Sequence, residues 1–153
     1  TLVPVMGAVG EQKTKPTQHS VKELMSIGIQ PDIIMCRSSE PLRDNARRKI
    51  SLFCNVEEEA IFTVYDVEGV HRVPLLFEDQ DVAAVLQRKL GVSPRIPDLS
   101  GWKGYVKALE SATDAVRIAL VGKYTGLKDS YISHLKALTH AGAALGVVPR
   151  LTW

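Results

Sequence analysis

The stretch IIMCRSSEPLRDNARRKISLFCNVEEEAIFTVY, residues 33–65, decides the fold class. It opens with an apolar run at 33–36 and closes with a second one at 61–65, and both have the length and composition of buried strands. Between them, residues 43–53 place apolar side chains three or four positions apart, which is the spacing of a helix. A strand, a helix and a strand in this order predict an α/β fold with a largely parallel sheet.

Elements of the same two kinds are expected on both sides of this stretch. Residues 1–6 read as a short apolar strand, and Ser20 and Glu23 have the spacing of a capping box that would open a helix. Further along, residues 75–90 predict one long helix that Gly91 ends. We therefore expect the chain up to residue 91 to belong to one α/β domain.

The composition changes after that point. Residues 92–101 contain two prolines and a glycine without periodicity, and together with a short amphipathic helix they predict an inter-domain linker at 92–114. A second β-α-β unit should follow, with its strand, helix and strand at 116–122, 129–144 and 147–153. Because so small a sheet cannot cover both of its faces, residues 115–153 are expected to be the start of a truncated second domain.

Composition and charge exclude several classes of protein. The chain is 45% hydrophobic and 24% charged, with a net charge of +2, as in soluble globular domains. The small net charge and the lack of aromatic residues among the basic ones argue against nucleic acid. No apolar run is long enough to span a membrane and no secretory leader is recognisable, so the cytoplasm is the expected location.

The sequence offers no metal site and no nucleophile. Cys36 and Cys54 each end an apolar stretch and are expected to be buried and free, and the four histidines lack metal-ligand spacing. A phosphate-binding P-loop is excluded at the first basic stretch because Gln12 stands where the glycine before the lysine is needed. It is excluded at Gly122–Thr125 because Tyr124 displaces the hydroxyl residue. We predict no catalytic residue.

The best candidate for a ligand site is the stretch GEQKTKPTQHS, residues 10–20. Two lysines flank a threonine, a proline follows, and hydrogen-bonding side chains lead into the predicted start of a helix. Unpaired N–H groups and the positive end of a helix dipole favour a phosphate at such a position. These features alone fit an anion site and an ordinary basic loop equally well.

The same stretch, continued through Val21–Leu24, resembles the signature segment of CTP synthases, the glutamine-dependent enzymes that convert UTP to CTP. The resemblance covers nearly the whole chain, in blocks at residues 28–33, 36–38, 49–56, 73–76, 118–124, 129–131 and 137–141.

The resemblance implies two groups of binding residues. The first binds UTP as substrate and CTP as feedback inhibitor, with the last residue of the group at the phosphates: Lys13, Thr14, Lys15, Pro16, Thr17, Gln18 and Lys49. The second lies against the adenine of ATP and consists of Tyr65, Asp66 and Val67.

The resemblance also implies an architecture and a reaction. The chain would span the end of a P-loop-type synthetase domain, a linker and the first β-α-β unit of a class I glutamine amidotransferase domain. ATP would phosphorylate UTP, and ammonia from glutamine would displace the phosphate, with Mg²⁺ as cofactor, GTP as a further ligand and a homo-tetramer as the assembly.

The metal ligands and the amidotransferase triad are expected outside these residues, so the chain alone should be inactive. A non-catalytic UTP- or CTP-binding module, regulatory or for assembly, remains the alternative.

Overall fold

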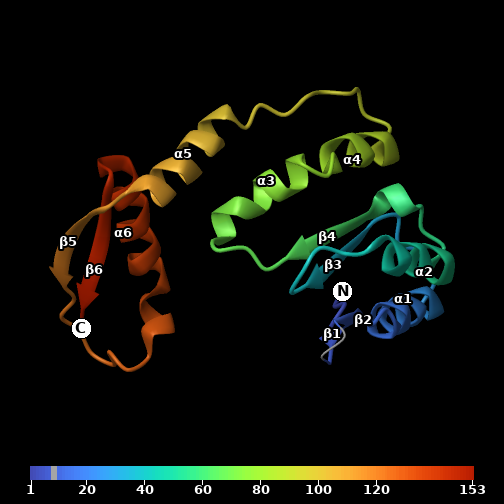
Figure 1. Ribbon diagram of the computed structural model, residues 1–153, viewed down its shortest axis with the longest axis horizontal. Helices are drawn as coiled ribbons and strands as arrows, with labels where there is room; N and C mark the ends of the chain where they lie inside the picture. The colour runs from blue at the N-terminus through green and yellow to red at the C-terminus, as the bar shows by residue number, and fades with distance from the viewer. Residues whose placement is uncertain (8–9) are drawn as a thin grey trace. The chain divides into compact units, whose positions relative to one another are not determined.

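A computed structural model describes residues 1–7 and 10–153, and the chain divides into two compact units, residues 1–97 and 98–153 (Figure 1). The first unit contains β1 (Val5–Met6), β2 (Glu11–Gln12), α1 (Lys15–Ser26), β3 (Ile34–Ser38), α2 (Asp44–Cys54), η1 (Glu58–Ala60), β4 (Ile61–Tyr65), η2 (Val70–Arg72), α3 (Val73–Glu78) and α4 (Val82–Leu90). The second contains α5 (Ser100–Ser111), β5 (Asp114–Ala119), η3 (Lys128–Tyr131), α6 (Ile132–Leu145) and β6 (Val147–Thr152).

The centre of the first unit is the parallel pair of β3 and β4, which run side by side in Figure 1. Their register starts at Ile34 opposite Ile61 and ends at Ser38 opposite Tyr65. With α2 as the connection, this confirms the strand–helix–strand order and the parallel sheet predicted from residues 33–65.

The N-terminal segment lies along the other edge of β3. The N–H of Val3 donates to the carbonyl of Arg37 at 2.8 Å, and the N–H of Arg37 donates to the carbonyl of Thr1 at 2.8 Å. The predicted strand at residues 1–6 is therefore shorter than expected: a parallel bridge at Leu2, then β1, which pairs with β2 as an antiparallel hairpin. Pro4 lies between the two and has no N–H to donate to a longer ladder.

The core of the first unit gathers apolar side chains from the strands and from the inner faces of α1 and α2. Phe62, Ile50 and Ile61 are its largest fully buried members. Cys36 and Cys54 belong to it as free thiols, as predicted, and burial raises the pKa of both. Both cysteines therefore pack as small apolar residues.

The first helix begins five residues before the predicted capping box. α1 starts at Lys15 with Pro16 in its first turn, where the fixed φ of proline suits a helix and its missing N–H costs nothing. Ser20 lies inside the helix and its hydroxyl donates to the carbonyl of Pro16 at 3.1 Å. The prediction that Ser20 opens the helix is wrong, and residues 15–20 of the supposed loop belong to α1.

The long helix predicted at 75–90 is also wrong, because two helices, α3 and α4, occupy that part of the chain. Between them Asp81 adopts the left-handed conformation, with φ of 54°. The break brings the side chain of Gln80 to β4, where it accepts from the N–H of Thr63 and donates to its carbonyl, both at 2.9 Å. Gln80 thus pairs with β4 as a strand residue would.

The second unit is a β-α-β unit, as predicted, with β5 and β6 parallel from Asp114 opposite Val147 to Ala119 opposite Thr152. α6 packs on β6 and α5. At the contact with β6, a Cβ on Gly142 would lie 2.6 Å from the carbonyl oxygen of Val147, so this approach requires glycine. Helix α5, predicted within the linker at 92–114, groups with this unit, whereas residues 92–97 are exposed and form neither helix nor strand.

None of the helices within residues 1–7 and 10–153 combines the length and the apolar composition that crossing a bilayer requires.

Candidate functional site

The basic stretch from Lys13 to Gln18 carries the chain from β2 into the first turn of α1. Lys13 and Lys15 are exposed there. Thr14 is the N-cap residue, but its side chain makes no capping bond, and the first turn contains no acidic residue. The N–H groups of a first helical turn lack acceptors within the helix. Two cationic side chains therefore stand at the positive end of α1, and no acidic residue lies within its first turn.

Glu11 is the nearest acidic partner of this cluster. Its carboxylate pairs with the Nζ of Lys13 at 2.6 Å, and both side chains are exposed. The hydrogen bond from Lys13, followed by its charge, lowers the pKa of Glu11 below its usual range, and the charge of Lys49 lowers it further. Lys49, on α2, thus lowers the pKa of the same carboxylate as Lys13 does, but more weakly.

Not every predicted residue presents its side chain to solvent. Thr17 is fully buried and its hydroxyl donates to the carbonyl of Leu2 at 3.0 Å. The hydroxyl of Thr14 accepts from the side-chain amide of Gln18 at 2.9 Å. These bonds fix α1 on the N-terminal segment and leave Lys13, Lys15, Lys49 and the backbone of the first turn as the groups best placed to meet a ligand.

The residues predicted for ATP follow the carboxyl end of β4. Tyr65 is the last residue of β4, Asp66 and Val67 come next, and the carboxylate of Asp66 pairs with the Nη2 of Arg37 at 2.8 Å. A cavity of about 410 Å³ lies here, lined by Leu2, Val3, Pro4, Val5, Arg37, Ser38, Ser39 and Asp66. The carboxyl ends of parallel strands are where open α/β sheets bind ligands.

One group in this cavity lacks an internal partner. Ser38 is 3% exposed, and its hydroxyl has no hydrogen-bond partner among the residues that the structure describes. A buried polar atom without a partner costs about 1–3 kcal/mol.

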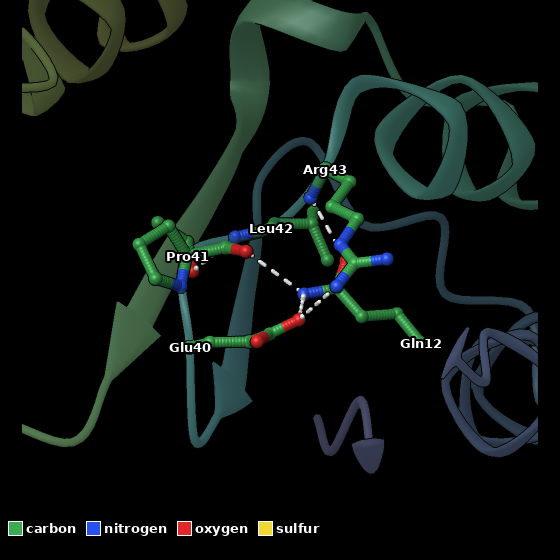
Figure 2. Close-up of polar contacts among 6 residues, drawn as sticks. Gln12, Glu40, Pro41, Leu42 and Arg43 are labelled. Carbon is green, nitrogen blue, oxygen red and sulfur yellow. Dashed lines mark hydrogen bonds and ion pairs between the residues drawn. The ribbon is translucent and has the colours of Figure 1, made fainter. Parts of the chain in front are cut away.

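Sequence reasoning missed three polar residues beside the basic stretch: Gln12, Glu40 and Arg43. Figure 2 shows the side chain of Gln12 reaching toward Pro41 and Arg43, with Glu40 beneath. The amide of Gln12 donates to the carbonyl of Pro41 at 2.8 Å, and its oxygen accepts from the N–H of Arg43 at 2.8 Å. No sequence pattern reveals such contacts, because the partners are about 30 positions apart and the bonds use the main chain.

The arrangement supports binding better than bond chemistry. Over residues 1–7 and 10–153, no three or more His, Cys, Asp or Glu side chains gather as a metal site would require. What these residues offer is a cationic helix start with Lys49 close by, and a cavity at the ends of two parallel strands.

Comparison with known proteins identifies the family. A protein-family model described as CTP synthase N-terminus matches residues 1–92. Proteins named CTP synthase are similar over all 153 residues: the protein of Thermococcus kodakarensis is 55% identical, that of Pyrococcus furiosus 51% and that of Paramagnetospirillum magneticum 46%. The chain spans 28–29% of the length of these relatives. The chain belongs to the CTP synthase family.

Proposed function

We propose that this chain supplies the residues that bind the pyrimidine nucleotide, here called the grip, in an enzyme that makes CTP from UTP, ATP and glutamine. Family membership supports the reaction class. The observation that carries the proposal is the start of α1, where Lys13 and Lys15 stand at the positive end of the helix and no acidic residue occupies the first turn. The contrast with α2, which has Asp44 in its first turn, makes the absence at α1 meaningful.

The electrostatics of this helix start favour a bound polyphosphate. Cationic side chains at a helix N-terminus repel the helix dipole, each typically by about 0.3–1 kcal/mol. A triphosphate placed there accepts hydrogen bonds from the backbone N–H groups. Its negative charge attracts both the lysines and the positive end of the helix dipole. Lys13 then binds from the residues just before α1, Lys15 from the first turn of α1, and Lys49 from α2.

The remaining residues of the stretch hold the start of α1 in place and are not proposed to bind the phosphates. Pro16 fixes the first turn, Thr17 anchors α1 to Leu2, and Thr14 and Gln18 hold one another. UTP and CTP share the triphosphate and ribose, so a grip of this kind binds both, and CTP inhibits by occupying the place of UTP.

The cavity at the ends of β3 and β4 is proposed to receive the adenine of ATP beside Tyr65, Asp66 and Val67. Its lining includes Asp66, Ser38 and Ser39, whose polar groups suit the polar edge of a base. Residues 1–91 would then belong to a P-loop-type synthetase domain. Residues 115–153 would begin a class I glutamine amidotransferase domain, with the linker at 92–114, in a homo-tetramer.

The decisive test is nucleotide binding by the full-length protein with Lys13→Ala and with Lys49→Ala. Each change should weaken UTP and CTP binding about tenfold, and the double variant should lose less than the product if both lysines grip one triphosphate. Calorimetric titration measures this directly. Lys22→Ala is the matched control, because Lys22 is an exposed lysine on α1 beyond its first turn. Unchanged affinity for both nucleotides in both lysine variants would overturn the proposal.

A further inference from the structure

Gln12 is a buried polar side chain placed between the two elements that carry the lysines. It is 9% exposed, and its amide donates to the carbonyl of Pro41 at 2.8 Å and to the carboxylate of Glu40 at 3.4 Å (Figure 2). Its oxygen accepts from the N–H of Arg43 at 2.8 Å. Both ends of the amide are thus used by the segment that leads into α2.

The bond to Arg43 caps a helix from a distance. Arg43 is the N-cap residue of α2, and its own side chain makes no capping bond. Gln12 takes the N–H of Arg43, one of the donors that the start of a helix leaves without an intrahelical acceptor. The start of α2 is therefore fixed by the residue immediately before Lys13.

A second contact joins the same two segments. Glu40 accepts from the Nη2 of Arg43 at 3.0 Å as well as from Gln12. A Cβ added to Gly10, whose φ is +62°, would lie 3.2 Å from the same Nη2 atom. The guanidinium of Arg43 therefore rests on the turn before Gln12, held there by Glu40.

These contacts are separate from those that hold the fold. α1 is tied to the N-terminal segment by the bonds from Thr17 to Leu2 and from the N–H of Lys13 to Pro4, at 3.0 and 2.9 Å. The apolar core lies around β3, β4, α1 and α2 and does not include Gln12. Removing the Gln12 amide should leave those two hydrogen bonds and the apolar core in place. The distance between the start of α1 and the start of α2 would then no longer be fixed by Gln12.

We propose that Gln12 is a positioning residue of the pyrimidine-nucleotide site, a brace that sets the spacing between Lys13 and Lys49 before the triphosphate arrives. The inference rests on the proposed function, because it assigns the brace to that same grip. Binding groups fixed in advance lose less freedom when the ligand binds, so the brace raises affinity without touching the nucleotide. A glutamine suits the position because it donates and accepts at one end of an unbranched side chain.

The first test replaces Gln12 by methionine, which has a similar length and shape but neither donates nor accepts comparably. In the full-length protein, Gln12→Met should raise the Kd for UTP and for CTP about tenfold. The Kd for a non-hydrolysable ATP analogue should stay within about twofold, because the cavity beside Asp66 does not include Gln12.

Gln30→Met is the matched control. The amide of Gln30 donates to the carbonyls of Cys54 and Asn55 at 3.1 Å, at the opposite end of α2. Gln30→Met likewise removes a side-chain amide that bonds to one end of α2, and the affinity for UTP should not change. If Gln30→Met weakens UTP binding as much as Gln12→Met does, the effect is general loosening of α2 and the inference falls.

The second test uses pH and does not depend on the stability of the methionine variant. In Gln12→Glu, the ionised carboxylate would face the carbonyl of Pro41 and the carboxylate of Glu40, so the bond to Pro41 is lost. Burial and Glu40 raise the pKa of the new acid, while the guanidinium of Arg43, already paired with Glu40, opposes that rise. Once protonated, the acid donates to Pro41 and accepts from Arg43 as glutamine does. The ratio of variant to wild-type Kd for UTP should therefore shrink several-fold between about pH 8 and about pH 5.5.

The outcomes separate the two proposals. If Lys13→Ala weakens UTP binding while Gln12→Met does not and the Gln12→Glu ratio is independent of pH, the grip stands and the brace is wrong. If neither lysine matters, the proposed function itself fails.

Discussion

At the scale of single residues, Glu11 and Lys13 show how a surface ion pair shapes the binding site. Exposed pairs of this kind add little to stability. The pair matters more for the local charge, because the positive charges of Lys13 and Lys49 both lower the pKa of Glu11. A nucleotide phosphate would compete with this carboxylate for Lys13.

The pKa of Glu11 offers a measurement of that pairing. In a ¹³C NMR titration, its carboxyl should titrate below the usual range for glutamate, and Lys13→Ala should move the midpoint upward, because the hydrogen bond and charge of Lys13 are the largest causes of the shift. Since the folded pKa is lowered, the contribution of the pair is present above the ordinary glutamate pKa and is lost as pH falls through the lowered one. The same midpoint in both proteins would show that the pair does not persist in solution.

Residue identity predicted part of the site. The lysines, threonines and glutamine of residues 13–18 were selected by resemblance and by their place before a helix, and Lys49 by resemblance alone. The roles of Thr17 and Gln12 could not be predicted, since each depends on a main-chain carbonyl supplied by a distant segment. Tertiary hydrogen bonds to the backbone leave no mark on composition or spacing.

At the scale of elements, β3, β4 and α2 follow their apolar patterns, while the strand predicted at residues 1–6 and the starts and breaks of other helices do not. The capping box at Ser20 matched a real motif, but Pro16 starts the helix a turn earlier. The pattern at 75–90 is continuously helical in composition, yet Gln80 leaves it to pair with Thr63. In both places a specific local or tertiary contact decides against the periodic pattern.

The pairing of Gln80 with β4 can be tested by hydrogen exchange. Gln80→Leu removes the acceptor of the Thr63 N–H and the donor to the Thr63 carbonyl, at a cost of about 1–3 kcal/mol for the unpaired groups. The Thr63 amide should therefore exchange at least about tenfold faster. Gln87→Leu serves as the control, since the amide of Gln87 donates to Arg95 in the exposed connecting segment. Unchanged exchange at Thr63 in the Gln80 variant would contradict the assignment.

At the scale of the whole molecule, the division between residues 97 and 98 is the main feature. The proline-rich composition of residues 92–101 pointed to this region because proline and glycine interrupt both kinds of periodicity. The position of α5 was harder to predict, since an amphipathic helix shows that it packs but does not show on which unit. Its contacts with α6 answer that question.

The connecting segment should be the first site of proteolysis. Ile96 is 97% exposed, and residues 92–97 form neither helix nor strand. Brief trypsin treatment of the 153-residue chain should therefore cut after Arg95 and give fragments 1–95 and 96–153 by mass spectrometry. Arg95→Gln should remove this early cut. First cleavage inside α1 or α2 would show instead that those helices open more readily than the segment.

The amide of Gln80 also affects how this protein meets other chains. An edge strand with free N–H and carbonyl groups is a template on which a foreign strand can add, and this is a common route to aggregation. At Thr63, in the middle of β4, those groups are already hydrogen-bonded to the side-chain amide of Gln80, which offers no further strand for another chain to pair with. A foreign strand would have to expel Gln80 before it could add there.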